Sequence, residues 1–244
     1  MAGAGPSLIW DVYRMLEIVF WIAAGLAVYV YAGYPVFLWL LKLLGGARAV
    51  ARAADYEPSV TVIISAYNEA AVIRAKLANT VELDYPTDKL EVIAVSDASS
   101  DGTDDIVSSF GDPRVKLLRM SQRGGKTVGL NAAVKAARGD IVVFSDANAM
   151  YVCDAIRKMV RNFADAKVGA VVGESTYADG TGGAQQSESL YWKYETGIKR
   201  LETQLGSTVG GDGAIYAIRR NLYRDMRPDA LSDFVNPMQI VMSG

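Results

Sequence analysis

The stretch FSDANAM, at residues 144–150, ends an apolar run in an acidic residue. Asp146 follows IVVFS, so the sequence predicts a buried strand whose end presents a carboxylate. Asn148 stands two residues later, where a second carboxylate would complete a pair of oxygen ligands for a hard divalent cation. Asp and Asn are also common turn residues. On these residues alone, a metal site, a weakened metal site and a plain turn all remain open.

A second acidic residue, Asp97, ends the apolar run LEVIAVS within AVSDASSDGTDD. A carboxylate accepts two hydrogen bonds, so it suits the imide N–H of a uracil or a ribose hydroxyl. The alternative is helix capping, for which Ser99, Ser100 and Asp101 are good residues. Both can hold together, with Asp97 at a ligand and its neighbours at a helix start.

The segment RGGKT, at residues 123–127, matches a phosphate-binding loop only in part. The P-loop pattern G-x-x-x-x-G-K-[ST] needs a glycine at Met120, so kinase or ATPase chemistry is disfavoured. The dinucleotide fingerprint G-x-G-x-x-G is also absent after the first predicted strand, where AYNEA stands. Gly124 and Gly125 can still open a helix whose N–H groups and Lys126 face an anion. A solvated helix start is the equal alternative.

The elements that position these residues are short apolar strands alternating with helices after Pro58. This alternation predicts a parallel α/β sheet with right-handed crossovers. In such a sheet the carboxyl ends of the strands meet at one crevice, where ligands bind. The predicted strands span residues 59–66, 90–97, 114–120, 140–146, 168–175 and 213–220. The predicted helices span 68–83, 125–137, 185–206 and 230–241, and a further one opens within 99–110.

The composition limits the available chemistry. The 244 residues carry a net charge of −2, which leaves no basic footprint for nucleic acid. The single Cys153 excludes an internal disulfide and fits a reducing compartment. Histidine is absent, which removes Ser/His/Asp triads, Cys/His dyads and His-ligated zinc. Any catalyst here must use Asp, Glu, Lys, Tyr, a metal or the backbone.

An uncharged run of 24 residues, from Ile18 to Leu41, precedes the sheet region. As a helix at ~1.5 Å per residue it would span roughly 36 Å, more than the ~30 Å hydrocarbon core of a bilayer. A cleaved signal peptide and a buried core helix are weaker alternatives, because the run is too long and too apolar all round. Pro35 should kink the helix. Lys42 and Arg48 follow the run, which places the rest of the chain in the cytoplasm.

Six blocks occur in a recognisable order and spacing: VTVIISAYNEAAVI, EVIAVSDASSDGTDDI, RGGKTVGLNAA, IVVFSDAN, GGDGAIYAIRR and LSDF. Over residues 17–244 the chain resembles family 2 glycosyltransferases, in particular membrane-bound cellulose, hyaluronan and chitooligosaccharide synthases. The resemblance implies a GT-A fold, which is a Rossmann-like, mostly parallel α/β sheet flanked by helices, behind one transmembrane helix. It also implies an enzyme of the hexosyltransferase type that uses a nucleotide-sugar, usually a UDP-sugar, with Mg²⁺ or Mn²⁺ as the cofactor.

The resemblance also assigns roles to single residues. Lys126 matches a lysine beside the diphosphate, Asp146 matches the first acid of a D-x-D metal motif, and Asn148 takes the place of the second acid. Asp233 in LSDF matches the general base, and Ser232 stands where another acid usually precedes it. For Asp233 an N-cap of the last helix is the alternative. The implied nucleotide-sugar-binding positions are Ala66, Tyr67, Asn68, Glu69, Asp97, Lys126 and Asp146.

Two further residues are candidates for the acceptor site. Asp212 in GGDGAIYA could hydrogen-bond an acceptor hydroxyl, although a turn-stabilising role is as common. Trp192 could stack on a sugar, although a packing role is more common at its helical spacing. The expected partners are a nucleotide-sugar donor, a glycan or lipid acceptor and the lipid bilayer, without nucleic acid.

The expected organisation has four parts. They are an N-terminal segment (1–16), a transmembrane helix (17–44), a linker (45–57) and a GT-A domain (58–244). The last is expected to be C-terminally incomplete, because processive relatives carry a Q-x-x-R-W segment and more membrane helices after the base. We expect a single-pass protein of the inner (plasma) membrane with a cytoplasmic catalytic domain. The alternatives are a polyprenyl-phosphate glycosyltransferase and a catalytically silent GT-A scaffold or partner-binding module, which Asn148 and Ser232 would suit.

Overall fold

The computed structural model describes residues 6–46, 49–174, 183–208, 210–211 and 213–243. The chain forms two compact units. One unit contains Met1–Arg48 and Gly183–Ser207, and the other contains Ala49–Gly182 and Thr208–Gly244.

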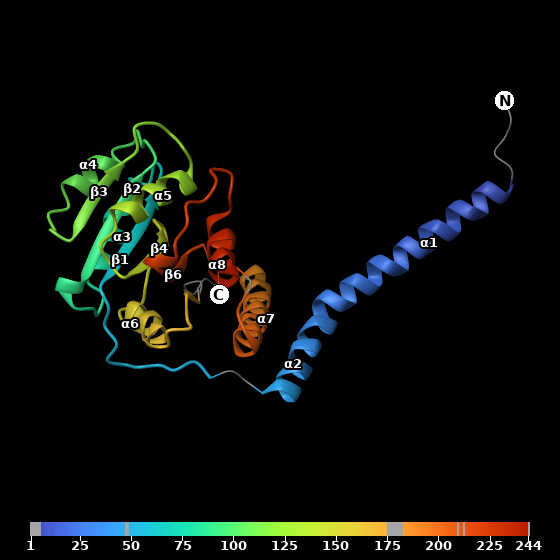
Figure 1. Cartoon of the computed structure of the whole chain (residues 1–244). Helices are drawn as coiled ribbons and strands as arrows, with labels where there is room; N and C mark the ends of the chain where they lie inside the picture. Colours follow the sequence, from blue (N-terminus) through green and yellow to red (C-terminus); the bar gives the residue numbers. More distant parts are fainter. Residues whose placement is uncertain (1–5, 47–48, 175–182, 209, 212, 244) are drawn as a thin grey trace, which may run out of the picture. The chain divides into compact units, whose positions relative to one another are not determined.

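The larger unit is built on a six-stranded sheet with the strand order β3-β2-β1-β4-β6-β5 (Figure 1). The strands are β1 (Val60–Ala66), β2 (Leu90–Ser96), β3 (Val115–Arg119), β4 (Ile141–Asp146), β5 (Ala170–Val172) and β6 (Ile215–Arg219). The first four are mutually parallel, whereas β6 pairs antiparallel with both β4 and β5. The sheet therefore confirms the mostly parallel α/β architecture, and only β5 is much shorter than its predicted range.

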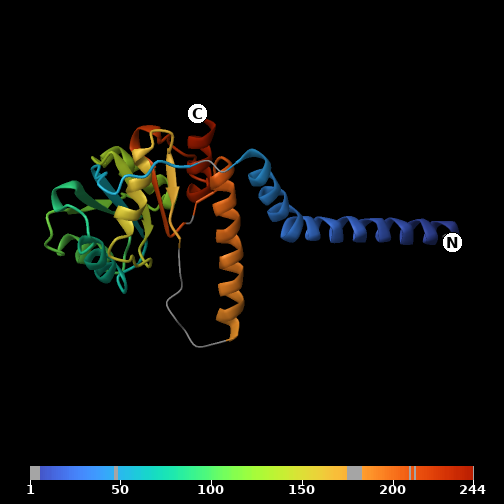
Figure 2. The same ribbon diagram turned by 90° about the horizontal axis from the view of Figure 1, so that it is seen from below.

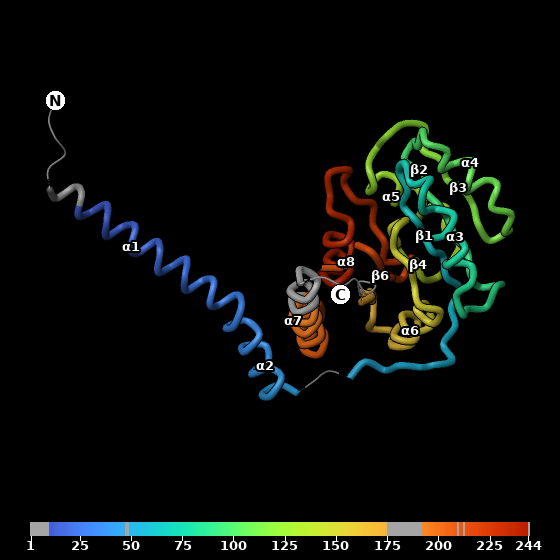
Figure 3. Tube along the Cα trace, turned by 180° about the vertical axis from the view of Figure 1, so that it is seen from behind, coloured from blue at the N-terminus to red at the C-terminus, as the bar shows by residue number. Residues whose placement is uncertain are grey.

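Helices cover both faces of this sheet, and the chain passes repeatedly between strand and helix (Figure 3). Neighbouring strand residues point to opposite faces, so Val62 and Ile63 belong to different apolar clusters. The cluster around Ile63 takes in side chains of α5 (Lys126–Ala136) and α8 (Ser232–Met242). The cluster around Val62 takes in side chains of α3 (Ile73–Val81), α4 (Thr103–Ser108) and α6 (Ala155–Val160). Short 3₁₀ turns lie at Thr87–Lys89, Arg161–Ala164 and Arg220–Leu222.

Helix α3 begins five residues later than the predicted 68–83, at Ile73. Asn68 has a left-handed backbone with φ of 56°, which interrupts a right-handed helix. Its N–H donates to Oγ of Ser99 (3.1 Å), and its Oδ1 accepts from the N–H of Ser100 (2.9 Å). The prediction of a helix from residue 68 is wrong because these hydrogen bonds fasten the segment to the loop after β2.

The smaller unit contains α1 (Pro6–Val28), a π-helical turn (Tyr29–Gly33), α2 (Tyr34–Gly45) and α7 (Gly183–Leu205). The helix axis changes direction at the π-helical turn (Figure 2). Pro35 lacks an N–H, so the carbonyl of Tyr31 loses its usual helical donor. The hydroxyl of Tyr194, on α7, takes that place, at 2.9 Å from the carbonyl oxygen of Tyr31 and 3.1 Å from that of Val30. The carbonyl groups at the expected bend thus accept hydrogen bonds from a side chain of the same unit.

The helical stretch Trp10–Gly45 is long and apolar enough to cross a membrane. Most of its large apolar side chains, including Trp21, Tyr31 and Trp39, are exposed, whereas Leu38 is buried. Apolar side chains exposed all round a helix of this length are typical of a membrane span.

Candidate functional site

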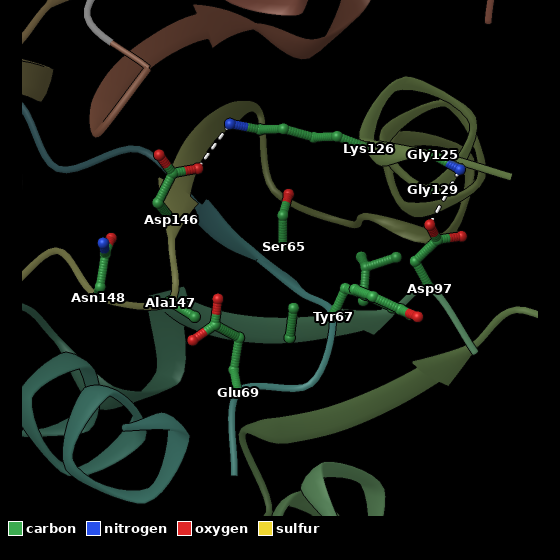
Figure 4. Close-up of a pocket in the computed structure, with 12 residues that line it drawn as sticks. Ser65, Tyr67, Glu69, Asp97, Gly125, Lys126, Gly129, Asp146, Ala147 and Asn148 are labelled. Atoms are coloured by element: carbon green, nitrogen blue, oxygen red, sulfur yellow. Dashed lines mark hydrogen bonds and ion pairs between the residues drawn. The ribbon is translucent and has the colours of Figure 1, made fainter. Parts of the chain in front are cut away.

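A pocket of about 270 Å³ opens at the carboxyl ends of β1, β2 and β4 (Figure 4). Ser65 on β1 lies beside Asp146 of β4 and beside Val95 of β2, so the three strand ends meet at one edge of the sheet. This is the position at which open α/β sheets bind ligands. The lining residues are Ser65, Ala66, Tyr67, Glu69, Val95, Asp97, Gly125, Lys126, Gly129, Asp146, Ala147 and Asn148.

Most residues singled out from the sequence line this pocket. Ala66, Tyr67, Glu69, Asp97, Lys126, Asp146 and Asn148 all do so. Asn68 is the exception, because its side chain and N–H are bonded to the loop after β2. Asn68 therefore shapes the turn between Tyr67 and Glu69, and the pocket wall is formed by those two neighbours.

The carboxylate of Asp97 is held by two backbone N–H groups. Gly124 donates to Oδ1 at 2.7 Å, and Gly125 donates to Oδ2 at 2.9 Å. Gly125 has φ of 85°, a conformation that favours glycine. The anion that faces these N–H groups is thus Asp97 itself. The N-cap of α4 is Gly102, and Asp101 before it accepts from the N–H of Thr103 at 3.0 Å. Asp97 fixes the loop before α5 while also lining the pocket.

On the other side of the pocket, Lys126 pairs with Asp146. The Nζ atom of Lys126 lies 2.5 Å from Oδ1 of Asp146, as the dashed line in Figure 4 marks. Lys126 is the first residue of α5, and Asp146 is the last residue of β4. Both side chains are more than a third exposed, so this pair contributes little to stability and can be separated by a ligand.

Asp146 and Asn148 both line the pocket, and both side chains carry oxygen atoms. Carboxylate and amide oxygens are suitable ligands for Mg²⁺ or Mn²⁺. Within the described ranges, no cluster of three or more Asp, Glu, Cys or His side chains could hold a metal ion. The residues therefore fit a cation that takes its remaining ligands from phosphate oxygens and water.

Asp233 lies next to Asp146 across a glycine. A Cβ atom added to Gly213 would lie 3.1 Å from Oδ2 of Asp233 and 3.9 Å from Oδ2 of Asp146. The backbone oxygen of Asp233 also accepts a hydrogen bond of 2.6 Å from the N–H of Gly211. Asp233 is the second residue of α8, whose N-cap is Leu231. The structure thus brings Asp233 to the pocket region, although it is not a lining residue.

The backbone before Asp233 rests on a buried tyrosine. The hydroxyl of Tyr216 donates to the carbonyl of Ser232 at 3.3 Å. Burial raises the pKa of Tyr216 above its ordinary value, and the charge of Asp233 raises it further, so this hydroxyl remains protonated. Ser232 is itself buried. Ser232, which stands where the resembling family usually has an acid, is therefore part of the packed support of Asp233.

Helix α5 holds the loop that leads to Asp233. The hydroxyl of Thr127 donates to the carbonyl of Ala230 at 2.8 Å, and the side-chain amide of Asn131 donates to the carbonyl of Met226 at 2.8 Å. Helix α5 therefore carries Lys126 at its start and also holds the loop before Asp233, even though these residues are far apart in the sequence.

The two acceptor candidates remain predictions. Trp192 lies on α7, in the smaller unit, and is half-buried. Asp212 lies outside the described residues.

Two lining residues, Val95 and Gly129, were not identified from the sequence as part of the site. Position 129 requires a glycine, because a Cβ atom there would lie 2.9 Å from Cγ1 of Val95. Its lack of a side chain lets α5 approach β2 closely.

Comparisons with known proteins agree with this geometry. A family model described as "Glycosyl transferase family 2" matches residues 61–227. "Probable glycosyltransferase YdaM" of Bacillus subtilis (strain 168) is 38% identical over 123 residues, which cover 48% of this chain and 29% of the relative. "Poly-beta-1,6-N-acetyl-D-glucosamine synthase" of Staphylococcus aureus (strain COL) is 27% identical over 196 residues, which cover 73% of this chain and 47% of the relative. The chain thus spans less than half the length of these curated relatives.

A solved structure supports the same assignment. The mannosyltransferase PcManGT from Pyrobaculum calidifontis, in complex with GDP-Man and Mn²⁺, matches with a TM-score of 0.74 and 31% identity. The match covers 88% of this chain and 62% of that chain. The six-stranded sheet is therefore a GT-A fold. With its family-model match and its pocket at the strand ends, the chain belongs to glycosyl transferase family 2.

Proposed function

We propose that this chain binds a nucleoside diphosphate sugar and transfers the sugar, with inversion, to a glycan or lipid-linked acceptor. The observation that carries the proposal is the meeting of Asp97, Lys126 and Asp146 in one pocket at the carboxyl ends of three parallel strands. Asp97 and Tyr67 would bind the nucleoside, and Lys126 would bind the diphosphate.

Tyr67 is placed to stack on the nucleobase of the donor. The residue is 39% exposed, and the guanidinium of Arg123 lies 4.1 Å from the centre of its ring. A planar base can stack on an exposed aromatic ring and on a guanidinium. The family resemblance favours a UDP-sugar, whereas the solved relative that holds GDP-Man makes a GDP-sugar the second choice.

The chemistry would be one in-line displacement at the anomeric carbon. The bond from that carbon to the acceptor oxygen forms as its bond to the diphosphate oxygen breaks on the opposite face, which inverts the configuration. Asp233 would take the proton of the acceptor hydroxyl, and Lys126 would stabilise negative charge on the leaving diphosphate. Mg²⁺ or Mn²⁺, held by Asp146 and Asn148, would supply further positive charge at that diphosphate when bound.

Membrane attachment through Trp10–Gly45 is part of the proposal. The exposed apolar side chains of this stretch support it, and so does the charge of Lys42 at its C-terminal end. The positive-inside rule then places the GT-A unit on the cytoplasmic face of the inner (plasma) membrane. The acceptor would be a glycan or lipid met at that membrane.

A donor-turnover assay tests the proposal. The full chain in detergent micelles is incubated with UDP-glucose, UDP-N-acetylglucosamine or GDP-mannose and Mn²⁺, and the release of free UDP or GDP is measured. We expect release from one donor above that of a heat-denatured sample. Release from none of the donors, together with no nucleotide binding, would favour a silent GT-A scaffold instead.

A further inference from the structure

Lys76, on α3, is a fully buried lysine, with 0% of its surface exposed. Lysine is almost never fully buried unless it is paired, and the ion pairs between described residues do not include it. Its Nζ atom donates to the carbonyl oxygen of Ala149 at 2.5 Å and lies 3.4 Å from the centre of the Tyr151 ring. The buried amine therefore contacts the segment that follows the end of β4.

This segment, residues 146–151, carries both Asp146 and Asn148, and we call it the ligand loop. A second side chain of α3 also holds it. The Oδ1 atom of Asn79 accepts from the N–H of Tyr151 at 2.8 Å, and its Nδ2 donates to the carbonyl of Tyr151 at 2.9 Å. Lys76 and Asn79 are three residues apart and share one face of the helix. The ligand loop is thus fixed at one end by the sheet and at the other by α3.

Stability does not account for a lysine at this position. Burial lowers the pKa of Lys76 from 10.5 to about 7, and only the charge of Asp146 acts in the opposite direction. Burying an unpaired charged group costs free energy that an apolar side chain of similar volume does not. A methionine would fill nearly the same space, but it could not donate to Ala149.

We propose that Lys76 is a positioning residue for the oxygen ligands of the pocket. By holding the carbonyl of Ala149, it fixes the ligand loop so that Asp146 and Asn148 face the diphosphate and its cation. Since Asn148 contributes no charge, the fixed placement of its oxygen matters more here than it would for a second carboxylate. This inference rests on the proposed function, because it assigns a role in binding a nucleoside diphosphate with a metal ion.

The test compares Lys76→Met with Thr80→Val in the full chain. Thr80 is buried one turn further along α3, and its hydroxyl donates to the carbonyl of Lys76 at 2.8 Å. Thr80→Val therefore removes a hydrogen bond within the same helix and leaves the hydrogen bonds of Lys76 and Asn79 to the ligand loop in place. Calorimetric titration with UDP and with GDP, each with excess Mn²⁺, gives the affinity. Thermal unfolding without nucleotide gives the stability of each variant.

We expect Lys76→Met to weaken the binding of nucleotide with Mn²⁺ by about 10–100-fold, the usual loss when a residue that orients metal ligands is removed. Its unfolding temperature should equal or exceed that of the wild type. Thr80→Val should bind as the wild type does. Lys76→Gln, which keeps an N–H donor, should retain more affinity than Lys76→Met.

Three results would overturn the inference: unchanged affinity in Lys76→Met, an equal loss in Thr80→Val, or an unfolding temperature of Lys76→Met below that of the wild type. An equal loss in Lys76→Gln and Lys76→Met would also contradict the role of the hydrogen bond. If the wild type binds neither UDP nor GDP, the proposed function fails instead. The two failures are therefore distinguishable.

Discussion

The ammonium nitrogen of Lys126 lies 2.5 Å from Oδ1 of Asp146, and this contact joins the start of α5 to the end of β4. In the proposed complex, both groups exchange this contact for others. Lys126 turns to the phosphate oxygens of the donor, while Asp146 turns to the cation. The exposed ion pair thus keeps two binding groups close together at little cost in stability.

Lys126→Ala should weaken the binding of UDP or GDP with Mn²⁺ by roughly tenfold or more, since a hydrogen bond to a charged group contributes about 1.5–3 kcal/mol. Thermal stability should change little, because the ion pair is exposed. Titration calorimetry measures the affinity. The matched control is Lys158→Ala, which removes an exposed pair with Asp154 on α6. Equal affinities in the two variants would argue against a diphosphate contact at Lys126.

Asp233→Asn should reduce sugar transfer by about 10²–10⁴-fold, the usual contribution of a general base, and should leave nucleotide affinity unchanged. The asparagine keeps the size of the side chain beside Gly213 but cannot take the proton. Steady-state rates and nucleotide titration are measured on the same preparation. Asp229→Asn is the control, because Asp229 is exposed and pairs with Arg227. Unchanged turnover in Asp233→Asn would refute the base assignment.

Asn148→Asp should raise the affinity for Mn²⁺ in the absence of nucleotide, because it adds a second carboxylate to a site with one. In the wild type that affinity should be poor. Electron paramagnetic resonance of free Mn²⁺ measures the binding. The control is Asn162→Asp, on the 3₁₀ turn after α6. It adds the same charge elsewhere and should leave the affinity for Mn²⁺ unchanged. If Asn148→Asp binds Mn²⁺ no better than the wild type, Asn148 is not a metal ligand.

Stability should depend on the ionisation of Lys76. Its pKa is about 7 in the folded protein and 10.5 in the unfolded chain, so between these values the unfolded chain binds a proton that the folded protein does not. The free energy of unfolding should therefore rise with pH across this window, and most of the gain should be lost as pH falls to 7. The charge of Asp146 raises the pKa of Lys76 and so opposes the larger effect of burial.

Urea unfolding at pH 7 and pH 9 measures this dependence. Lys76→Met lacks the ionisable group and should show a smaller rise in the free energy of unfolding over the same interval. The comparison stays below the range in which the buried tyrosines would ionise in the unfolded chain. Equal slopes in the two proteins would contradict an unusual ionisation of Lys76.

Local sequence patterns predicted the strands of the sheet and the edge at which the pocket lies. The apolar runs that end at Ala66, Ser96 and Asp146 predict three parallel strands, and the rule for strand ends then predicts the pocket. The hydrogen bonds that close the site join residues far apart in the sequence, and local patterns do not indicate them. Asp97 binds Gly124 and Gly125, which lie 27 and 28 residues away in the sequence.

The start of α3 and the role of Lys76 were missed for a related reason. The segment around Asn68 has a helical pattern of residue types, but its backbone is set by hydrogen bonds to the next loop. A lysine on an amphipathic helix is normally solvated, so only the packing of α3 on the ligand loop reveals that Lys76 is buried. Helix α6, at Ala155–Val160, was not predicted, because it is only six residues long; Asp154, a common N-cap residue, stands at its start but makes no side-chain capping hydrogen bond.

The most direct test of the central claim is the titration of UDP and GDP into the full wild-type chain, with and without Mn²⁺. We expect one of the two nucleotides to bind at a single site, tightly with Mn²⁺ and much more weakly without it. Binding of neither nucleotide under any condition would contradict a nucleotide-sugar site formed by Asp97, Lys126 and Asp146.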